Sequence, residues 1–253
     1  MLPVGREGSL PELTQSYATP ARPARPRDAQ RREPTSPPSG PTPPASGIVL
    51  AGGRSSRFGR DKLAEPLDGR PLLHHAIRAL ASVCTEVIVV APAGDLSLAL
   101  PTDLPVPLRV VTDRTSFGGP LLGLAAGAAA AEEWWLVVAG GDMPGLEPAV
   151  LRAMLRAVAG RPGDRNGAGQ AASLELDGIG QRLPLALHRG AAAAAAGDLA
   201  ASGERSLGAL LEALDVRLVP ETHWRRLDPT ARTLHDVDVP ADLALRSLVP
   251  PGH

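Results

Sequence analysis

The sequence contains a single cysteine, Cys84, among 253 residues. An internal disulfide and a cysteine-based metal cluster are therefore excluded, and a lone thiol fits a reducing compartment. The formal net charge is −1, so there is no general basic field for nucleic acid, and anions must be bound by local clusters of charge. No stretch approaches the roughly 20 apolar residues that cross a bilayer, and the N-terminus lacks the apolar segment of a signal peptide. We expect a soluble, cytoplasmic protein that binds neither nucleic acid nor membrane.

The first 46 residues differ in composition from the rest of the chain. Pro, Arg, Ser and Thr dominate there, as in "ATPARPARPRDAQRREPTSPPSGPTPP". Proline removes backbone donors and the segment has little to bury, so we predict a disordered tail over residues 1–46. A dispensable extension, including one from a misplaced start codon, is one interpretation, and a basic docking arm is the other. Residues 47–253 are predicted to form one domain with a sound core.

From residue 47 onward, short apolar runs alternate with segments of helical periodicity. Strands alternating with helices, with both strand faces apolar, are typical of an α/β fold with a parallel sheet. Strands are predicted at 47–51, 86–92, 108–113, 171–176, 182–189 and 216–220, and a buried strand that runs into a loop is predicted at 134–144. Helices are predicted at 71–83, 119–132, 146–159, 190–196, 206–214 and 240–248, and a flexible loop at 160–170.

The first strand opens into a small, positively charged loop, "GIVLAGGRSSRFGRDK", residues 47–62. Glycines at 52 and 53 let backbone amides approach an anion closely, and arginines and a lysine follow within ten residues. The spacing is neither that of a Walker A loop nor that of the Rossmann G-x-G-x-x-G. Ligands of open α/β sheets bind at the carboxyl ends of the strands. The loop therefore indicates a phosphate-binding site, with a solvated basic loop as the alternative.

Acidic residues follow three other predicted strands. Asp142 follows a buried strand in "VVAGGDMPG", where a carboxylate suits Mg²⁺ that also contacts substrate phosphates. Asp113 stands at another strand end, where it could accept hydrogen bonds from a base or ribose. Asp236 and Asp238 alternate in "LHDVDVPADL", which predicts a common strand face. Turn or helix capping is the alternative for Asp142 and Asp238, and a surface turn for Asp113.

These segments, in this order, resemble the molybdenum cofactor guanylyltransferases, which belong to the wider nucleotidyltransferases. The resemblance covers residues 47–248 and rests on "GIVLAGGRSSRFGRDKLAEPLDGRPLL", "VVTDRTSFGGPLLGLAAG", "AGGDMP", "QRLPLALHR", "SGERSLGALLEAL" and "DVDVPADL". It implies a single nucleotidyltransferase domain with a three-layer α/β/α, Rossmann-like fold and a mostly parallel sheet. Adjacent glycines at 52 and 53 resemble the guanylyl version of the loop, because related cytidylyltransferases usually carry Ala-Ala-Gly.

The resemblance also implies roles for individual residues. The nucleotide-binding residues would be Leu50, Ala51, Gly52, Gly53, Lys62, Asp113 and Asp142. Arg57, Lys62 and Asp142 would be catalytic, and Asp142 would bind Mg²⁺ together with Asp238. Phe58 stands where methionine is usual, Gly141 replaces a frequent cysteine, and Val90–Pro92 occupy a stretch where some members have an asparagine that contacts the nucleotide.

The implied reaction is transfer of GMP from GTP to molybdopterin with release of pyrophosphate, and molybdoenzyme-assembly proteins are possible partners. We expect Arg182, His188 and Arg189 to contact the acceptor. His74 and His75 are interpreted as structural, Trp134 and Trp135 as core, and Cys84 as a small buried residue. The alternatives are a molybdopterin cytidylyltransferase, a sugar-phosphate nucleotidyltransferase, and a non-catalytic binding protein for molybdoenzyme assembly.

Overall fold

The computed structural model describes residues 40–52, 62–92, 99–113, 118–160 and 168–237. Its main sheet has seven strands in the order β5-β4-β1-β6-β8-β7-β9. The pairs β1–β4, β1–β6, β4–β5 and β7–β9 are parallel, whereas β8 runs antiparallel to β6 and β7. The strands are β1 (Ala45–Leu50), β4 (Glu86–Pro92), β5 (Leu108–Asp113), β6 (Trp135–Gly140), β7 (Ala171–Leu176), β8 (Ile179–His188) and β9 (Val216–Val219). The mostly parallel sheet predicted from the sequence is confirmed.

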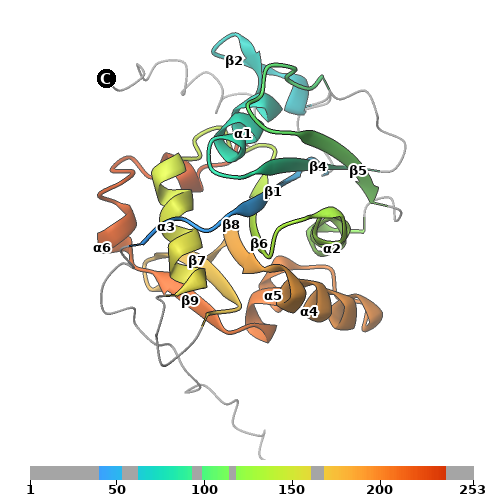
Figure 1. The fold of residues 1–253 in the computed structure, drawn as a ribbon, viewed down its shortest axis with the longest axis vertical. Coiled ribbons are helices and arrows are strands. Elements are labelled where there is room, and N and C mark those ends of the chain that lie inside the picture. The colour runs from blue at the N-terminus through green and yellow to red at the C-terminus, as the bar shows by residue number, and fades with distance from the viewer. Residues whose placement is uncertain (1–39, 53–61, 93–98, 114–117, 161–167, 238–253) are drawn as a thin grey trace, which may run out of the picture. The chain divides into compact units, whose positions relative to one another are not determined.

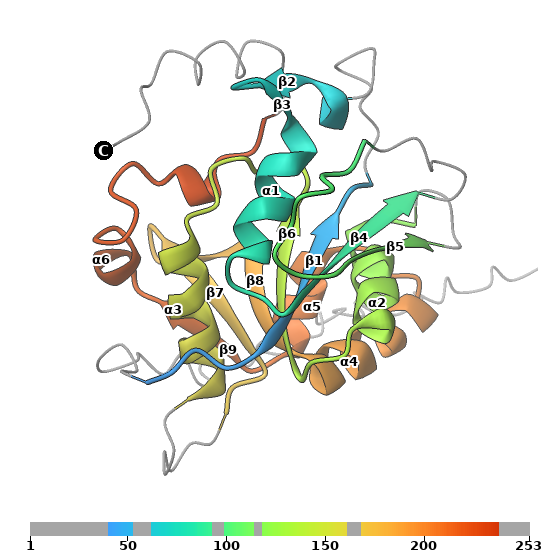
Figure 2. The same cartoon turned by 45° about the horizontal axis from the view of Figure 1, so that its top comes forward.

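Helices cover both faces of this sheet (Figures 1 and 2). Helices α1 (Leu72–Ala81) and α3 (Pro148–Ala159) lie on one face, and α2 (Pro120–Ala130), α4 (Arg189–Ala201) and α5 (Leu207–Ala213) lie on the other. A short helix, α6 (Glu221–Trp224), two 3₁₀ turns, η1 (Lys62–Ala64) and η2 (Arg232–Leu234), and a small hairpin of β2 (Pro66–Leu67) and β3 (Arg70–Pro71) complete the described elements. The three-layer α/β/α architecture matches the expectation.

Each face of the sheet has its own apolar core because strand side chains alternate between faces. Val49, Val89 and Val137 point toward α1 and α3. Ile48, Ile88 and Val138 point toward α2, α4 and α5. Both clusters are fully buried at these positions, so a one-residue shift of register would expose or unpair whole rows of side chains.

Helix α2 consists largely of small residues because it lies very close to the sheet. A Cβ on Gly127 would stand 2.8 Å from Ile48 Cγ2, and one on Gly123 would stand 3.3 Å from Leu50 Cδ2. Glycine at these positions allows the helix to approach β1, at a cost in helix propensity of about 1 kcal/mol each.

Most element boundaries agree with the sequence prediction, and β4, β5 and β7 have the predicted bounds. Strand β1 begins at Ala45, two residues inside the segment predicted as tail, because its pairing with β6 continues to Ala45 and its pairing with β4 to Ser46. Residues 235–237 are not a strand, so the strand predicted through Asp236 is wrong there. The rest of the predicted tail up to residue 39, most of the 160–170 loop and the helix predicted at 240–248 lie outside the described residues.

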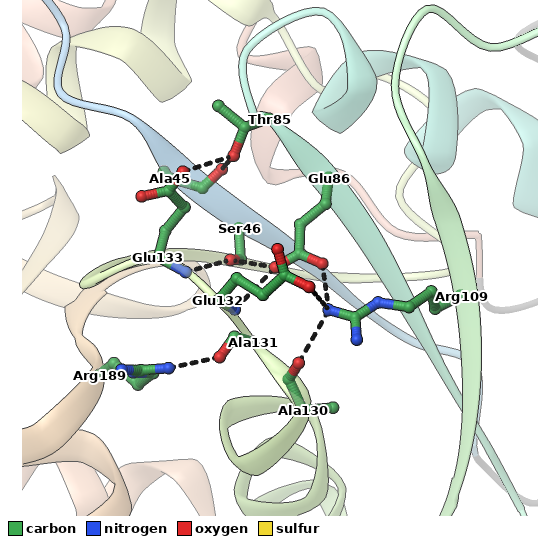
Figure 3. Close-up of polar contacts among 10 residues, drawn as sticks. All are labelled: Ala45, Ser46, Thr85, Glu86, Arg109, Ala130, Ala131, Glu132, Glu133 and Arg189. Atoms are coloured by element: carbon green, nitrogen blue, oxygen red, sulfur yellow. Dashed lines mark hydrogen bonds and ion pairs between the residues drawn. The ribbon is translucent and has the colours of Figure 1, made fainter.

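A polar network joins the amino ends of β1, β4 and β5 to the segment after α2 (Figure 3). Buried Glu86 accepts hydrogen bonds from Ser46 Oγ at 2.6 Å and from the Glu132 backbone N–H at 2.8 Å, and it is paired with Arg109. Arg109 also donates to the Ala130 carbonyl at the end of α2. This network lies at the amino ends of the strands, whereas the predicted site lies at their carboxyl ends. We therefore interpret the network as structural.

Candidate active site

Strands β1 and β6 are neighbours in the sheet, and the chain leaves them toward opposite sides of the sheet. From β1 the chain continues to β4 and β5, and it then crosses back through α2 to β6 on the other side of β1. In open α/β sheets, ligands usually bind at the carboxyl ends of the two strands where the direction reverses in this way. Leu50 and Gly140 are paired at these ends, so residues 51–52 and 141–142 lie at the same edge.

The loop after β1 is fixed where it leaves the sheet. The Ala51 N–H donates to the Val90 carbonyl at 2.9 Å, and Ala51 is buried. Gly52 is exposed, and a Cβ there would meet only Pro92 Cγ, at 3.8 Å. Among the described residues, packing therefore does not require glycine at position 52, and an exposed glycine lets a ligand approach the backbone closely. Gly53 and Arg57 lie outside the described residues.

Lys62 and Asp142 meet at this edge although 80 positions separate them. The Lys62 Nζ donates to Asp142 Oδ2 at 2.9 Å. The lysine side chain is 11% exposed and the aspartate side chain 33% exposed, so the pair is only partly open to solvent. Lys62 is also the only lysine in the sequence, where the other 25 basic residues are arginines. A compact ammonium group is suited to acting as a point charge on phosphate.

The two glycines before Asp142 determine where its carboxylate lies. The Gly141 N–H donates to the Leu50 carbonyl at 3.0 Å, which extends the β1–β6 contact by one residue. A Cβ on Gly140 would stand 2.5 Å from Asp142 Oδ1. The carboxylate therefore folds back over Gly140, into space that an ordinary side chain would fill.

Of the two other predicted site acids, the structure describes the backbone of Asp113 but not Asp238. The backbone of Asp113 ends β5 opposite Pro92, at the same carboxyl edge as Asp142. Asp238 lies outside the described residues, but the N–H of Val237 donates to the Asp142 carbonyl at 3.0 Å. The chain just before Asp238 therefore lies beside Asp142, a proximity that sequence spacing alone did not reveal.

Two of the three residues expected to contact the acceptor lie elsewhere. Because β8 is antiparallel to β6, His188 pairs with Trp135 at the amino end of β6, opposite the edge that carries Asp142. His188 Nδ1 accepts the Ala191 N–H at 3.3 Å and so caps α4, and Arg189 donates to the Ala131 carbonyl. The expectation for His188 and Arg189 is therefore wrong, and both residues are structural.

Arg182 lies toward the other end of β8, where a Cβ on Gly208 of α5 would stand 3.5 Å from its Nε. This places it at the β8 end nearer the site.

The interpretations of the remaining chemistry-bearing residues have mixed outcomes. The His74 and His75 rings bond to the carbonyls of Ala99 and Leu67, which agrees with a structural role. Cys84 is buried as predicted, and burial, with the nearby Glu86 charge, raises the pKa of its thiol to about 12.

Trp134 is 64% exposed, so its assignment to the core is wrong. It packs beside the His188 ring and under the Arg189 guanidinium at the surface instead.

The described residues contain no cluster of three or more His, Cys, Asp or Glu side chains able to hold a metal ion. This does not conflict with magnesium, which commonly takes one or two protein carboxylates and completes its shell with water and substrate phosphate. The Asp142 carboxylate is partly exposed at the carboxyl end of β6 and has the oxygen chemistry of such a ligand. Within the same described ranges, no helix is both long and apolar enough to cross a membrane.

Residues 47–218 match the family described as the MobA-like NTP transferase domain. The chain belongs to this family. A probable molybdenum cofactor guanylyltransferase from Chloroflexus aggregans is 36% identical over 208 residues, which are 79% of this chain and 92% of the relative. A protein with the same description from Mycobacterium tuberculosis is 35% identical over 177 residues, or 68% of this chain and 81% of the relative. The family resemblance drawn from the sequence motifs is confirmed.

Two solved structures share the fold. The molybdopterin-guanine dinucleotide biosynthesis protein A from Archaeoglobus fulgidus matches with a TM-score of 0.63 and 22% identity, over 80% of this chain and 96% of that one. The protein Rv0371c from Mycobacterium tuberculosis matches with a TM-score of 0.59 and 22% identity, over 82% and 100% of the two chains. At this level of identity the two structures support the architecture alone.

Proposed function

We propose that this member of the MobA-like family is a molybdenum cofactor guanylyltransferase. It transfers GMP from GTP to the terminal phosphate of molybdopterin and releases pyrophosphate. The names of the relatives and the sequence motifs support this assignment, and one observation carries it: the Lys62–Asp142 pair, 2.9 Å apart, lies at the carboxyl ends of the neighbouring strands β1 and β6. A cation for phosphate and a carboxylate for a divalent ion stand there side by side.

In the proposed complex, the nucleotide lies along the loop that follows β1. Leu50, Ala51 and Gly52 contact the nucleotide, with exposed Gly52 admitting it close to the backbone. Gly53 and Arg57 continue this cradle along the phosphates, and Asp113, at the end of β5, accepts hydrogen bonds from the base or ribose. Lys62 moves its charge from Asp142 toward the departing pyrophosphate.

The bond changes are those of a phosphoryl-group transfer. An oxygen of the molybdopterin phosphate forms a bond to the α-phosphorus of GTP, and the bond from that phosphorus to the bridging oxygen of pyrophosphate breaks. Such chemistry depends chiefly on alignment and on neutralising charge. Asp142, with Asp238 as a second carboxylate, would hold Mg²⁺, which when bound offsets the charge of the reacting phosphates. Arg57 and Lys62 provide the remaining positive charge.

Pyrophosphate release, measured with GTP, Mg²⁺ and molybdopterin, tests the proposal directly. Asp142→Asn and Lys62→Met are each expected to lower the rate by about 10²–10³-fold, as for loss of one preorganised electrostatic contact. Asp177→Asn is the matched control, because Asp177 is an exposed turn residue with φ of 51°, a conformation that asparagine also adopts. A near-normal rate in Asp142→Asn contradicts the proposed role.

A panel of GTP, CTP, ATP and UTP identifies the nucleotide. Preference for CTP would indicate a cytidylyltransferase, and no turnover with any nucleotide would favour the non-catalytic binding protein. The single lysine permits an independent binding test, because amine acetylation can label only Lys62 and the α-amino group. We expect GTP with Mg²⁺ to protect Lys62 and to leave labelling of the α-amino group unchanged. Contact with molybdoenzyme-assembly proteins stays a prediction from the sequence resemblance.

A further inference from the structure

The loop Asp142–Glu147, which joins β6 to α3, is contacted by a distant part of the chain. At its start, the Val237 N–H donates to the Asp142 carbonyl at 3.0 Å. In its middle, Gly145 lies so close to the Arg232 backbone that a Cβ would overlap the Arg232 carbonyl oxygen. At its end, the Glu147 N–H donates to Thr233 Oγ1 at 3.1 Å. Residues 228–237 therefore contact this loop at three points along its length.

The path of the 228–237 segment explains how it reaches the loop. Figure 2 shows the segment after α6 passing the start of α3 and continuing toward the start of α1, near β2 and β3. Its last described residue, Val237, is fully buried and packs with Leu67 and Leu72. This apolar contact holds Val237 in place, so the backbone N–H that it donates to the Asp142 carbonyl has a fixed position.

Asp228 organises the other end of this segment. The residue is 4% exposed. Its Oδ2 accepts the Thr233 N–H at 2.7 Å, and its Oδ1 accepts the Thr230 hydroxyl at 3.2 Å. The Asp228 carbonyl also accepts the Ala231 N–H at 3.1 Å, which closes a turn in which Ala231 has φ of 55°.

The electrostatics of Asp228 agree with an ionised carboxylate that has a structural task. Burial raises the pKa of Asp228, but hydrogen bonds from Thr233, the Arg232 backbone and Thr230 outweigh it and hold the pKa below its usual value. A buried carboxylate is costly unless its oxygens are satisfied, and these donors all belong to the segment that it orders.

Thr233 connects the turn to the loop that carries Asp142. It is fully buried, its backbone N–H donates to Asp228 Oδ2 at 2.7 Å, and its hydroxyl oxygen accepts the Glu147 N–H at the start of α3 at 3.1 Å. One residue therefore links the Asp228 turn to the loop, and its hydroxyl makes the contact to the loop. Valine has nearly the same shape but cannot accept this hydrogen bond.

We propose that Asp228 and Thr233 are positioning residues, which set the place of the Asp142 carboxylate by holding the Asp142–Glu147 loop against the 228–237 segment. This inference rests on the proposed function, in which Asp142 takes a divalent ion. Residues that support a metal ligand from behind typically contribute 10–100-fold to metal affinity. Thr233 contacts the loop directly and Asp228 orders the segment that carries Thr233, so both would act through the loop.

The test compares Thr233→Val with Thr233→Ser, which keeps the hydroxyl. We expect Thr233→Val to raise by about tenfold the Mg²⁺ concentration for half-maximal pyrophosphate release, and to weaken binding of Mn²⁺ in the presence of GTP, measured by electron paramagnetic resonance, to a similar extent. Thr233→Ser should restore both values to near those of the wild type. GTP affinity measured in EDTA should not change, because the loop positions the Asp142 carboxylate for the divalent ion and EDTA removes that ion.

Two further variants separate positioning from general stability. Gly145→Ala places a Cβ against the Arg232 carbonyl and should reproduce the Thr233→Val effect through a different contact. Thr85→Val is the matched control, because its hydroxyl bonds to Ala45 and Glu133 at the opposite edge of the sheet, and it should leave the Mg²⁺ requirement unchanged. Equal Mn²⁺ binding by Thr233→Val and Thr233→Ser overturns the proposal. Absence of pyrophosphate release by the wild type overturns the proposed function instead, and the Mn²⁺ titration still decides the positioning role.

Discussion

The Glu86 network predicts a specific loss of stability when its charge is removed. In Figure 3, one carboxylate oxygen of Glu86 faces Ser46 and the Glu132 backbone, and the other faces Arg109. In Glu86→Gln, the amide oxygen can keep the first pair of hydrogen bonds. The amide nitrogen then faces the Arg109 guanidinium, so two donors meet and the charged interaction is lost.

The size of the loss follows from which contacts disappear. A hydrogen bond to a charged group contributes about 1.5–3 kcal/mol, and Arg109 is 40% exposed, so it can turn to water and avoid part of the penalty. We expect Glu86→Gln to lower the free energy of unfolding by about 2 kcal/mol. Glu86→Ala removes all three acceptor contacts and leaves buried Ser46 without its carboxylate, which should cost about 3–5 kcal/mol.

Acid should reduce the difference between wild type and Glu86→Gln. Burial raises the pKa of Glu86, but the hydrogen bonds from Ser46, Glu132 and Arg109, with the charge of Arg109, outweigh it, so the folded-state pKa lies below 4.5. A carboxylate with a lowered pKa stabilises the fold above its unfolded-state pKa and loses that contribution as the pH falls through the folded-state value. The stability gap should therefore be full at pH 7 and shrink at acid pH.

Urea unfolding at several pH values measures these differences. The matched control is Glu132→Gln, because the Glu132 side chain is 77% exposed and lies 3.4 Å from the same arginine. An exposed pair of this kind contributes about 0–1 kcal/mol. If Glu86→Gln is no more destabilising than Glu132→Gln at pH 7, the reasoning about the buried carboxylate is refuted.

Three further outcomes follow from the described geometry. Gly140→Ala should lower turnover by about 10²-fold, because its Cβ would stand 2.5 Å from Asp142 Oδ1 and must displace the carboxylate; an unchanged rate in the pyrophosphate assay would contradict this. Cys84, with a thiol pKa raised to about 12, should react with a thiol reagent only after unfolding, and rapid modification of the native protein would argue against its burial. Acrylamide should quench Trp134, which is 64% exposed, and spare Trp224, which is fully buried and donates to the Glu175 carbonyl. The variants Trp134→Phe and Trp224→Phe assign the two signals.

The sequence predicted the fold well because the core pattern is local. Strands such as 86–92 and 108–113 are short apolar runs that end at a proline or an acid, and α1 buries residues three or four positions apart. The small hairpin β2–β3 and the short helix α6 were not predicted, because two- and four-residue elements have too few positions to show a period. Trp134 was misassigned because an aromatic residue next to a buried strand can lie just outside it.

The site was predictable where a residue follows directly on a strand and unpredictable where it depends on tertiary contact. Asp142 stands two residues after β6, and parallel strands bring their carboxyl ends to one edge, so its place beside the loop after β1 was foreseeable. Lys62 comes twelve residues after the end of β1, so its place at the same edge was expected from the family resemblance and not from its distance to a strand. The direction of β8 was not foreseeable, since nothing in "RLPLALHR" shows that this strand runs antiparallel to β6. His188 and Arg189 were placed at the wrong edge for that reason.

The support of Asp142 shows why motifs alone describe such a site incompletely. The "AGGDMP" motif explains the carboxylate locally, since Gly140 leaves room for it and Gly141 bonds to Leu50. The carbonyl of the same aspartate is fixed by Val237, almost a hundred positions later, and that residue is anchored by apolar packing. A carboxylate that must hold an ion at a set distance needs both its side chain and its backbone constrained. Only the constraint on the side chain comes from residues next to Asp142 in the sequence. Variants that weaken the constraint on the backbone should therefore alter metal binding while the motif stays intact.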